Sequence, residues 1–167
     1  MNIRSIGIAI AGLTLAACTH RDPTSATPGV RNADFGTLNG AKLELVAEGG
    51  IAALQMKYTV DHDTRAYAYS QRHICSDKCG APLDSASGTL SPAAADSLFN
   101  IVWAESPSSL RDDYGTTFSA ADMMTYTLSV TFEGNTKKIR ADDGTMPEPM
   151  RRIVDATRGV ITAARGK

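Results

Sequence analysis

The stretch that decides the fold is TYTLSVTFEGNTKKIRA, residues 125–141. Its first half alternates threonine and serine with apolar side chains, which are Tyr126, Leu128, Val130 and Phe132. This period of two is typical of a β-strand with one buried face. Gly134-Asn135 follows as a hairpin turn, because glycine accepts the positive φ of a type II′ turn. The sequence therefore predicts an antiparallel hairpin with one face in water.

Earlier segments show the same alternation. Residues 42–48 and 54–60 alternate apolar with polar side chains and are separated by Gly49-Gly50, while residues 65–72 form a weaker third strand. Two helices are predicted, one from Ser91-Pro92 to Pro107 and one from about Pro147 to Arg165. The predicted order is β-β-β-α-β-β-α. It indicates an α+β fold, with an antiparallel sheet of about five strands and both helices packed on one face, in a single domain over residues 38–167.

The composition excludes several classes of protein. Of the 167 residues, 17 are Lys or Arg and 18 are Asp or Glu, and this balance argues against nucleic-acid binding, which usually needs a basic surface. Hydrophobic residues make up 43% of the chain, which is too many for a disordered chain.

The N-terminus predicts export. One cation, Arg4, precedes an uncharged run of about 12 residues, whereas a membrane-spanning helix needs about 20. The run ends in Leu15-Ala16-Ala17-Cys18, which resembles a bacterial lipobox. The resemblance implies that residues 1–17 are a signal peptide and that Cys18 carries lipid, which anchors the chain in a membrane. The alternative is an ordinary secretory signal cut near Ala17, which would leave the thiol free.

A tether is predicted between the lipid and the domain. Residues 18–37 contain Pro, Gly, Ser and Thr without helical or strand periodicity, and about 19 flexible residues have a root-mean-square reach of about 25 Å. Thr19 after the lipidated position resembles lipoproteins sorted to an outer membrane. The expected location is the cell envelope, facing the periplasm from the outer membrane if the source has two membranes.

Cys75 and Cys79 lie in a short loop of the predicted domain. Export places them in an oxidising compartment, which favours a disulfide between them. The alternative is a metal site formed with His73 and Asp77. A structural zinc site usually contains a second, distant ligand pair, and the chain has no second cysteine pair. The sequence predicts the disulfide and neither a metal nor another cofactor.

Other candidate residues favour structural roles. His62 stands between Asp61 and Asp63, an arrangement that can support acid–base chemistry but is more typical of a solvated turn. Residues 142–144, Asp-Asp-Gly, lack the spacing of a calcium loop and indicate a turn. No familiar catalytic motif is present, so a non-enzyme is predicted, with a small hydrolase built from spatially convergent residues as the alternative.

Gly49-Gly50-Ile51 is the candidate binding loop. A glycine pair between two strands allows a tight corner, which is the simpler explanation of this stretch. The second explanation is functional, because the same corner places Ile51 at a loop tip. It would then act as an apolar contact on a binding module.

Three stretches together resemble the emfourin-type family of small bacterial α+β proteins: ELVAEGGIAAL (44–54), SPAAADSLFNIVWAE (91–105) and TYTLSVTFEGNTKKIRADDGTMPEPMRRIVDA (125–156). Some members of that family inhibit thermolysin-like metalloproteases. The lipobox, the tether and the cysteine loop depart from the family pattern. The resemblance implies a non-catalytic domain that binds an envelope or secreted protein, such as a metalloprotease. A structural envelope lipoprotein is the alternative.

Overall fold

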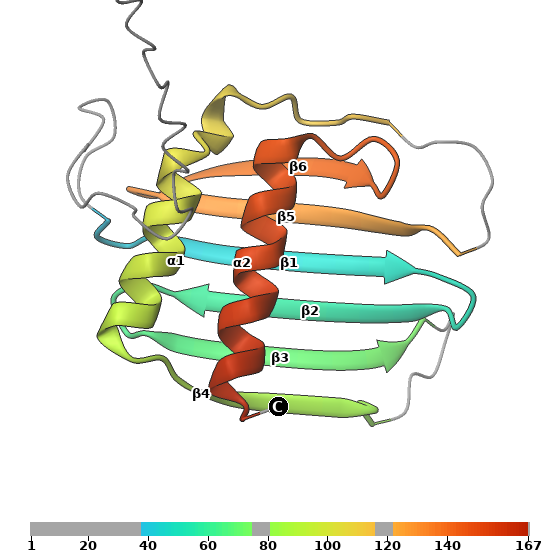
Figure 1. Cartoon of the computed structure of the whole chain (residues 1–167), viewed down its shortest axis with the longest axis horizontal. Helices are drawn as coiled ribbons and strands as arrows, with labels where there is room; N and C mark the ends of the chain where they lie inside the picture. Colours follow the sequence, from blue (N-terminus) through green and yellow to red (C-terminus); the bar gives the residue numbers. More distant parts are fainter. Residues whose placement is uncertain (1–37, 75–80, 116–121, 167) are drawn as a thin grey trace, which may run out of the picture. The chain divides into compact units, whose positions relative to one another are not determined.

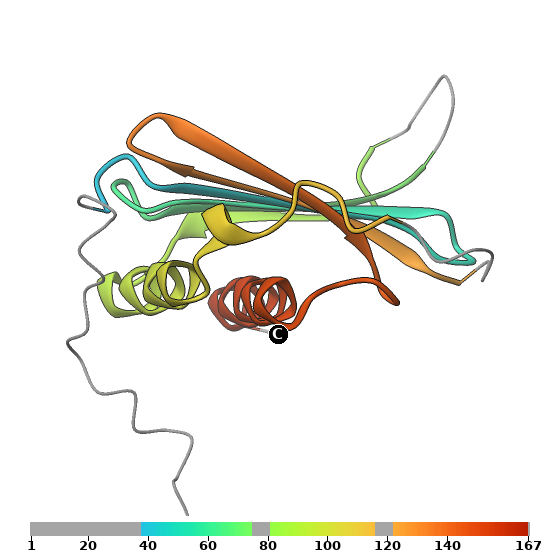
Figure 2. The same cartoon turned by 90° about the horizontal axis from the view of Figure 1, so that it is seen from above.

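The computed structural model describes residues 38–74, 81–115 and 122–166. They form an α+β domain, in which an open antiparallel sheet of six strands carries two helices on one face (Figures 1 and 2). The strands are β1 (Lys42–Gly49), β2 (Leu54–Asp61), β3 (Ala66–His73), β4 (Asp84–Thr89), β5 (Met124–Phe132) and β6 (Asn135–Asp142). The helices are α1 (Pro92–Ala104), the short 3₁₀ helix η1 (Pro107–Ser109) and α2 (Glu148–Ala164). The spatial order of the strands is β4-β3-β2-β1-β5-β6.

The predicted α+β class is confirmed, but the sheet has six strands rather than about five. The additional strand is β4, whose sequence DSASGT has no apolar alternation. It pairs with β3 over its whole length, from Asp84 opposite Gln71 to Thr89 opposite Ala66. Its position therefore depends on a neighbouring strand, which no local pattern in the sequence reveals.

The predicted β5–β6 hairpin is present, with a turn one residue earlier than expected. Phe132 pairs with Asn135, so the two turn residues are Glu133 and Gly134. Both have positive φ, of 49° and 81°, which corresponds to a type I′ turn rather than the expected type II′.

Alternation along the strands places the core between the sheet and the helices. Leu43 and Leu45 of β1 and Leu128 of β5 are buried on this face, whereas their polar neighbours lie on the other, open face. The largest fully buried side chains of the helices are Leu98, Phe99, Val102, Met150, Ile153 and Ile161. Figure 2 shows both helices beneath the same face of the sheet.

A side-chain cap and an ion pair between distant residues stabilise the helices. The Ser91 hydroxyl caps α1 by accepting a hydrogen bond from the Ala94 N–H at 3.2 Å, as the Ser-Pro signal predicted. Arg152 of α2 binds both carboxylate oxygens of Glu105, which follows α1, at 2.7 and 2.8 Å. No helix among the described residues is long and apolar enough to cross a membrane.

Candidate functional site

The corner between β1 and β2 is held by backbone geometry. Gly49 and Gly50 have φ values of 124° and 70°, which glycine adopts readily. A Cβ atom on Gly49 would lie 2.5 Å from the backbone oxygen of Met123, so any side chain there would clash. The Gly50 N–H also donates to that oxygen at 3.0 Å. The prediction of a tight corner is confirmed.

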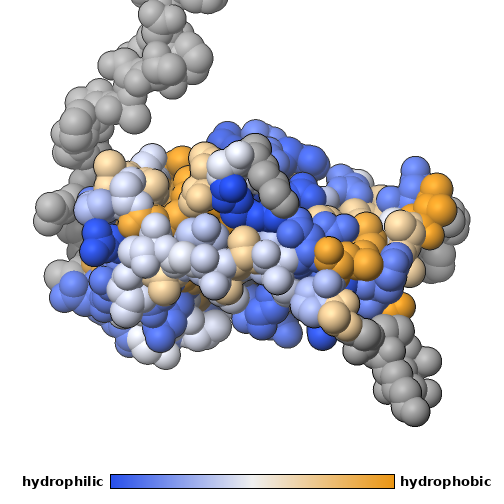
Figure 3. All heavy atoms as spheres, turned by 90° about the horizontal axis from the view of Figure 1, so that it is seen from below, coloured by the Kyte–Doolittle hydropathy of each residue, from blue (hydrophilic) through white to orange (hydrophobic). Residues whose placement is uncertain are grey.

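The same corner leaves Ile51 in solvent. Its side chain is 84% exposed, the highest value among the large hydrophobic residues described. Two more exposed hydrophobic residues lie at this end of the sheet, Ile74 after β3 at 47% and Leu83 before β4 at 55%. We refer to Ile51, Ile74 and Leu83 as the apolar end. Figure 3 shows hydrophobic side chains at the surface toward the right-hand end of the domain, with others toward its left-hand end.

Hydrogen bonds connect the segments that carry these side chains. The Ile74 N–H donates to the Ala53 oxygen at 2.6 Å, and Nδ1 of His73 lies 3.2 Å from the Ala52 oxygen. The Leu83 N–H donates to the Gln71 oxygen at 2.8 Å. The apolar end is therefore presented by backbone segments bonded to each other or to the sheet.

A polar row borders the apolar end on the open face of the sheet. Glu48, Gln55 and Arg72 lie side by side on β1, β2 and β3. The Gln55 amide donates to the Glu48 carboxylate, and Nε of Arg72 donates to the Gln55 amide oxygen at 2.5 Å. Because the Glu48 carboxylate and the Arg72 guanidinium carry opposite charges, the row adds no net charge. An apolar centre with a polar rim is the usual anatomy of a protein–protein interface.

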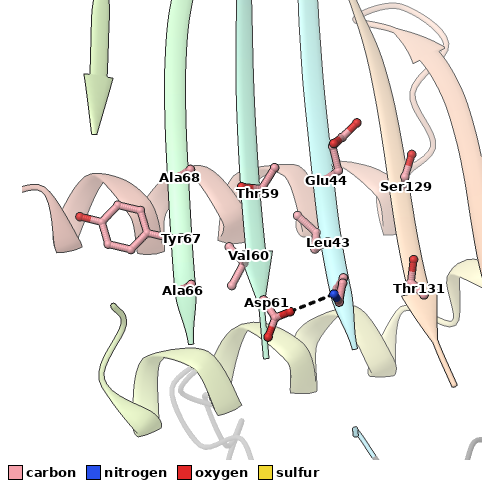
Figure 4. A pocket seen from close by; sticks show the side chains of 11 residues that line it. Leu43, Glu44, Thr59, Val60, Asp61, Ala66, Tyr67, Ala68, Ser129 and Thr131 are labelled. Atoms are coloured by element: carbon pink, nitrogen blue, oxygen red, sulfur yellow. Dashed lines mark ion pairs between the residues drawn. The ribbon is translucent and has the colours of Figure 1, made fainter. Parts of the chain in front are cut away.

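A second candidate site lies on the open face toward the opposite end of the strands, near the start of β1 and the end of β2, where a shallow depression has a volume of about 440 Å³ (Figure 4). It exists because small side chains such as Ala68 and Ser129 stand among longer ones. Lys42 and Asp61 form an ion pair at its edge, with Nζ and Oδ2 3.3 Å apart, and Figure 4 marks the ion pair of Asp61 with a dashed line. Glu44, also in its lining, pairs with Lys57 at 2.8 Å.

Asp61 is held in its ionised form. The backbone N–H of Thr64 donates to it at 2.9 Å and is the main reason that its pKa lies below the usual value. Burial opposes this hydrogen bond and is the second-largest effect on the pKa, while the Thr64 hydroxyl and the Lys42 ammonium each lower the pKa by a smaller amount. A carboxylate with a lowered pKa is a poor proton donor at neutral pH. Asp61 thus contributes a paired negative charge to the depression rather than a proton donor. The other polar groups of the lining are a second ion pair and hydroxyl groups.

His62 lies in the predicted turn, but the expectation that its side chain is solvated is wrong. Its side chain is only 18% exposed, and its ring stands edge-on to Phe99 of α1 with 5.1 Å between centroids. Nδ1 lies 3.3 Å from Asp63, and Nε2 lies 3.3 Å from Asp96 on α1. The reason is long-range packing, because α1 covers the turn. Among the described residues, no group of His, Cys, Asp and Glu is arranged to hold a metal ion.

The other predicted residues are distributed as follows. Asp142 is buried, and its Oδ1 accepts hydrogen bonds from the backbone of Gly144 and Thr145, which confirms the predicted turn. Cys18, Cys75 and Cys79 lie outside the described residues, so lipidation and the disulfide stay predictions. The sequence interpretation missed Ile74 and Leu83, although isolated apolar residues on both sides of the cysteine loop were a possible signal.

The chain matches no protein-family model, and no curated protein matches it. The resemblance to the emfourin-type family therefore stays a prediction. What can be concluded about function comes from the geometry of the domain.

Proposed function

We propose that the chain is a membrane-anchored envelope lipoprotein whose domain binds another protein through the apolar end. The exposure of Ile51 carries this proposal, since 84% of a large aliphatic side chain is held in water by a corner that only glycine allows. Exposed apolar groups that lie together and are bordered by polar residues are typical of interaction surfaces.

The path of the chain supports this arrangement. The tether enters the described domain at Leu38, just before β1 begins, and Ile51 follows the other end of β1. Eight residues of β-strand span about 26 Å at a rise of about 3.3 Å per residue. The apolar end is therefore at the end of β1 opposite the one at which the chain enters the described domain. A lipoprotein that binds a partner away from its own membrane needs its binding surface at the end of the domain remote from its anchor.

The partner we propose is an envelope or secreted protein, with a thermolysin-like metalloprotease as the specific case implied by the family resemblance. The apolar end fits a hydrophobic recess on such a partner better than it fits a charged ligand, because the adjacent charges of Glu48 and Arg72 have opposite signs and are both hydrogen-bonded to Gln55. Binding would bury Ile51 in the centre of the contact, where side chains contribute most to affinity.

An affinity experiment tests the proposal. The domain from Leu38 onward is immobilised, retained envelope and secreted proteins are identified, and thermolysin-like activity is assayed in its presence. Ile51→Asp should lose the retained partner, because a carboxylate would be buried without a counter-ion. Asn135→Asp adds the same charge at the opposite end of the sheet and should retain it. If Ile51→Asp retains the same protein as the parent, the apolar end is not the binding surface.

A further inference from the structure

Among the residues that the structure describes, none pairs through its backbone with the outer edge of β4. The Leu90 N–H donates to the Arg65 oxygen at 2.9 Å, which makes these two residues a hydrogen-bonded pair of the antiparallel ladder. Such pairs recur every second residue, so Gly88, Ala86 and Asp84 also face β3 with their N–H and C=O groups. The backbone groups of the intervening residues, Ser85, Ser87 and Thr89, must therefore point away from the sheet.

The opposite edge of the sheet is protected, in contrast to β4. Residues 112–114 run along β6, where the Tyr114 N–H donates to the Arg140 oxygen at 2.9 Å and the Arg140 N–H donates to the Asp112 oxygen at 2.8 Å. β6 also carries Lys137 and Lys138. Lysine, proline, bulges and covering segments are the usual means by which proteins prevent strand pairing at an edge. The sequence of β4, DSASGT, has no lysine or proline, and its register with β3 is continuous.

The outward groups of β4 are complementary to themselves. We propose that two copies of this chain pair through β4 in antiparallel orientation, with the two-fold axis at Ser87. In this register Ser87 faces Ser87 of the partner subunit, and Ser85 faces Thr89 of the partner subunit. All three outward residues then form hydrogen-bonded pairs, and the two sheets join into one of twelve strands. A two-fold axis requires this kind of self-complementary surface.

The side chains are compatible with this register. Ala86 faces Gly88 of the partner subunit, so small residues meet on the helix side, where the Tyr67 ring already lies 3.0 Å from the position of a Cβ on Gly88. On the open side only serine and threonine hydroxyls meet, and such cross-strand pairs are favourable. No like charges face each other, because the one charged residue of β4, Asp84, pairs with Arg165 of its own chain.

The helices leave room for the partner subunit. The segment after α2 reaches the edge of the sheet at Asp84, three residues from the proposed axis. Two such segments would therefore be separated by about six residues of strand, or about 20 Å, whereas a helix is about 10 Å wide. Leu83, which is 55% exposed, would face Ser91 of the partner subunit at the end of the paired strands.

Cysteine substitution in the full-length chain tests the register, in membranes of the producing cells under mild oxidation. Ser87→Cys should give a disulfide-linked dimer, because paired Cα atoms are about 5.5 Å apart and a disulfide spans 4.4–6.8 Å. Ser85→Cys is the matched control. Its two copies would be about 14 Å apart, four residues of strand, and should not link. The double variant Ser85→Cys/Thr89→Cys should link again. The parent chain gives the background from its own cysteines.

A second measurement does not depend on cysteine chemistry. Ser87→Pro removes an outward backbone N–H without removing a hydrogen bond to β3. This variant should therefore be a monomer in detergent solution. The control Ser87→Ala keeps the N–H and should remain a dimer. Ile51→Asp combined with Ser87→Cys should still link, which separates this proposal from the function proposed for the apolar end. The proposal would be overturned if the parent chain is monomeric. It would also be overturned if Ser85→Cys forms as much disulfide-linked dimer as Ser87→Cys.

Discussion

The guanidinium carbon of Arg165, directly after α2, lies 4.2 Å from the centroid of the Tyr69 ring on β3. The same guanidinium pairs with Asp84 on β4, and the Arg165 side chain is only 10% exposed. Seven residues earlier, Arg158 lies over Tyr126 of β5 at 5.7 Å. The second half of α2 is thus attached to the sheet by cation–π contacts as well as by its apolar side chains.

The first prediction concerns this attachment. Arg165→Ala should lower the unfolding temperature by a few degrees, because it removes the contact with Tyr69 and leaves Asp84 without its cation. Arg165→Lys should have an intermediate effect, because lysine keeps the charge but lacks a planar group that stacks on a ring. Arg151→Ala is the control, since that side chain is 45% exposed. Calorimetry of the three variants measures the effect, and an unchanged unfolding temperature in Arg165→Ala would refute it.

The second prediction concerns the corner at the apolar end. The control is Gly134→Ala in the β5–β6 turn. It should cost only about 1 kcal/mol of unfolding free energy, because Gly134 has a positive φ of 81° but an added Cβ meets nothing within 4 Å. Gly49→Ala should cost about 3 kcal/mol, because positive φ is combined with overlap with the Met123 oxygen. Urea denaturation compares the two variants. Equal costs would mean that the close approach to Met123 does not constrain the corner.

Much of this domain is predictable from local sequence, and the failures share one physical cause. β5 and β1 were predictable because each alternates large apolar and polar side chains. β4 was not, since DSASGT contains no large side chain and is held by pairing with β3 and by the Tyr67 ring over Gly88. The position of such a strand is determined by contacts with residues far away in the chain. A short stretch of sequence therefore does not reveal the strand with which it pairs.

The candidate site shows the same division. The corner at Gly49 and the loop position of Ile51 follow from a glycine pair between two strands. The neighbours Ile74 and Leu83 belong to segments that reach this end only through the order of the strands in the sheet. The prediction that His62 is solvated failed for a related reason. The residue that His62 packs against, Phe99, is 37 positions away in the chain.

The third prediction concerns pH. The pKa of Asp61 is lower in the folded protein than the ordinary value of an aspartate, chiefly through the Thr64 backbone N–H. A carboxyl whose pKa is lowered by folding stabilises the protein above its unfolded-state pKa, and this contribution is lost as the pH falls through the folded-state pKa. The parent should therefore lose stability below about pH 4 more steeply than Asp61→Asn. Denaturation curves between pH 7 and pH 2 test this, and parallel profiles would contradict it.

The fourth prediction concerns the anchor. Cys18→Ser should abolish incorporation of a labelled fatty acid and release the chain from the membrane fraction, because the thiol is the predicted site of lipidation. Cys75→Ser serves as the matched control and should remain labelled and membrane-bound. Labelling of Cys18→Ser at the level of the parent would show that the N-terminus is an ordinary secretory signal or that lipid is attached elsewhere.

The most direct test of the proposed function is photo-crosslinking from position 51 in the cells that produce the protein. A photoreactive amino acid in place of Ile51 should give one discrete adduct with a partner protein, because this side chain is 84% exposed at the proposed contact. The same group in place of Asn135, at the opposite end of the sheet, should not give that adduct. The account predicts the adduct at position 51 alone. The same adduct from both positions, or none from position 51, would contradict it.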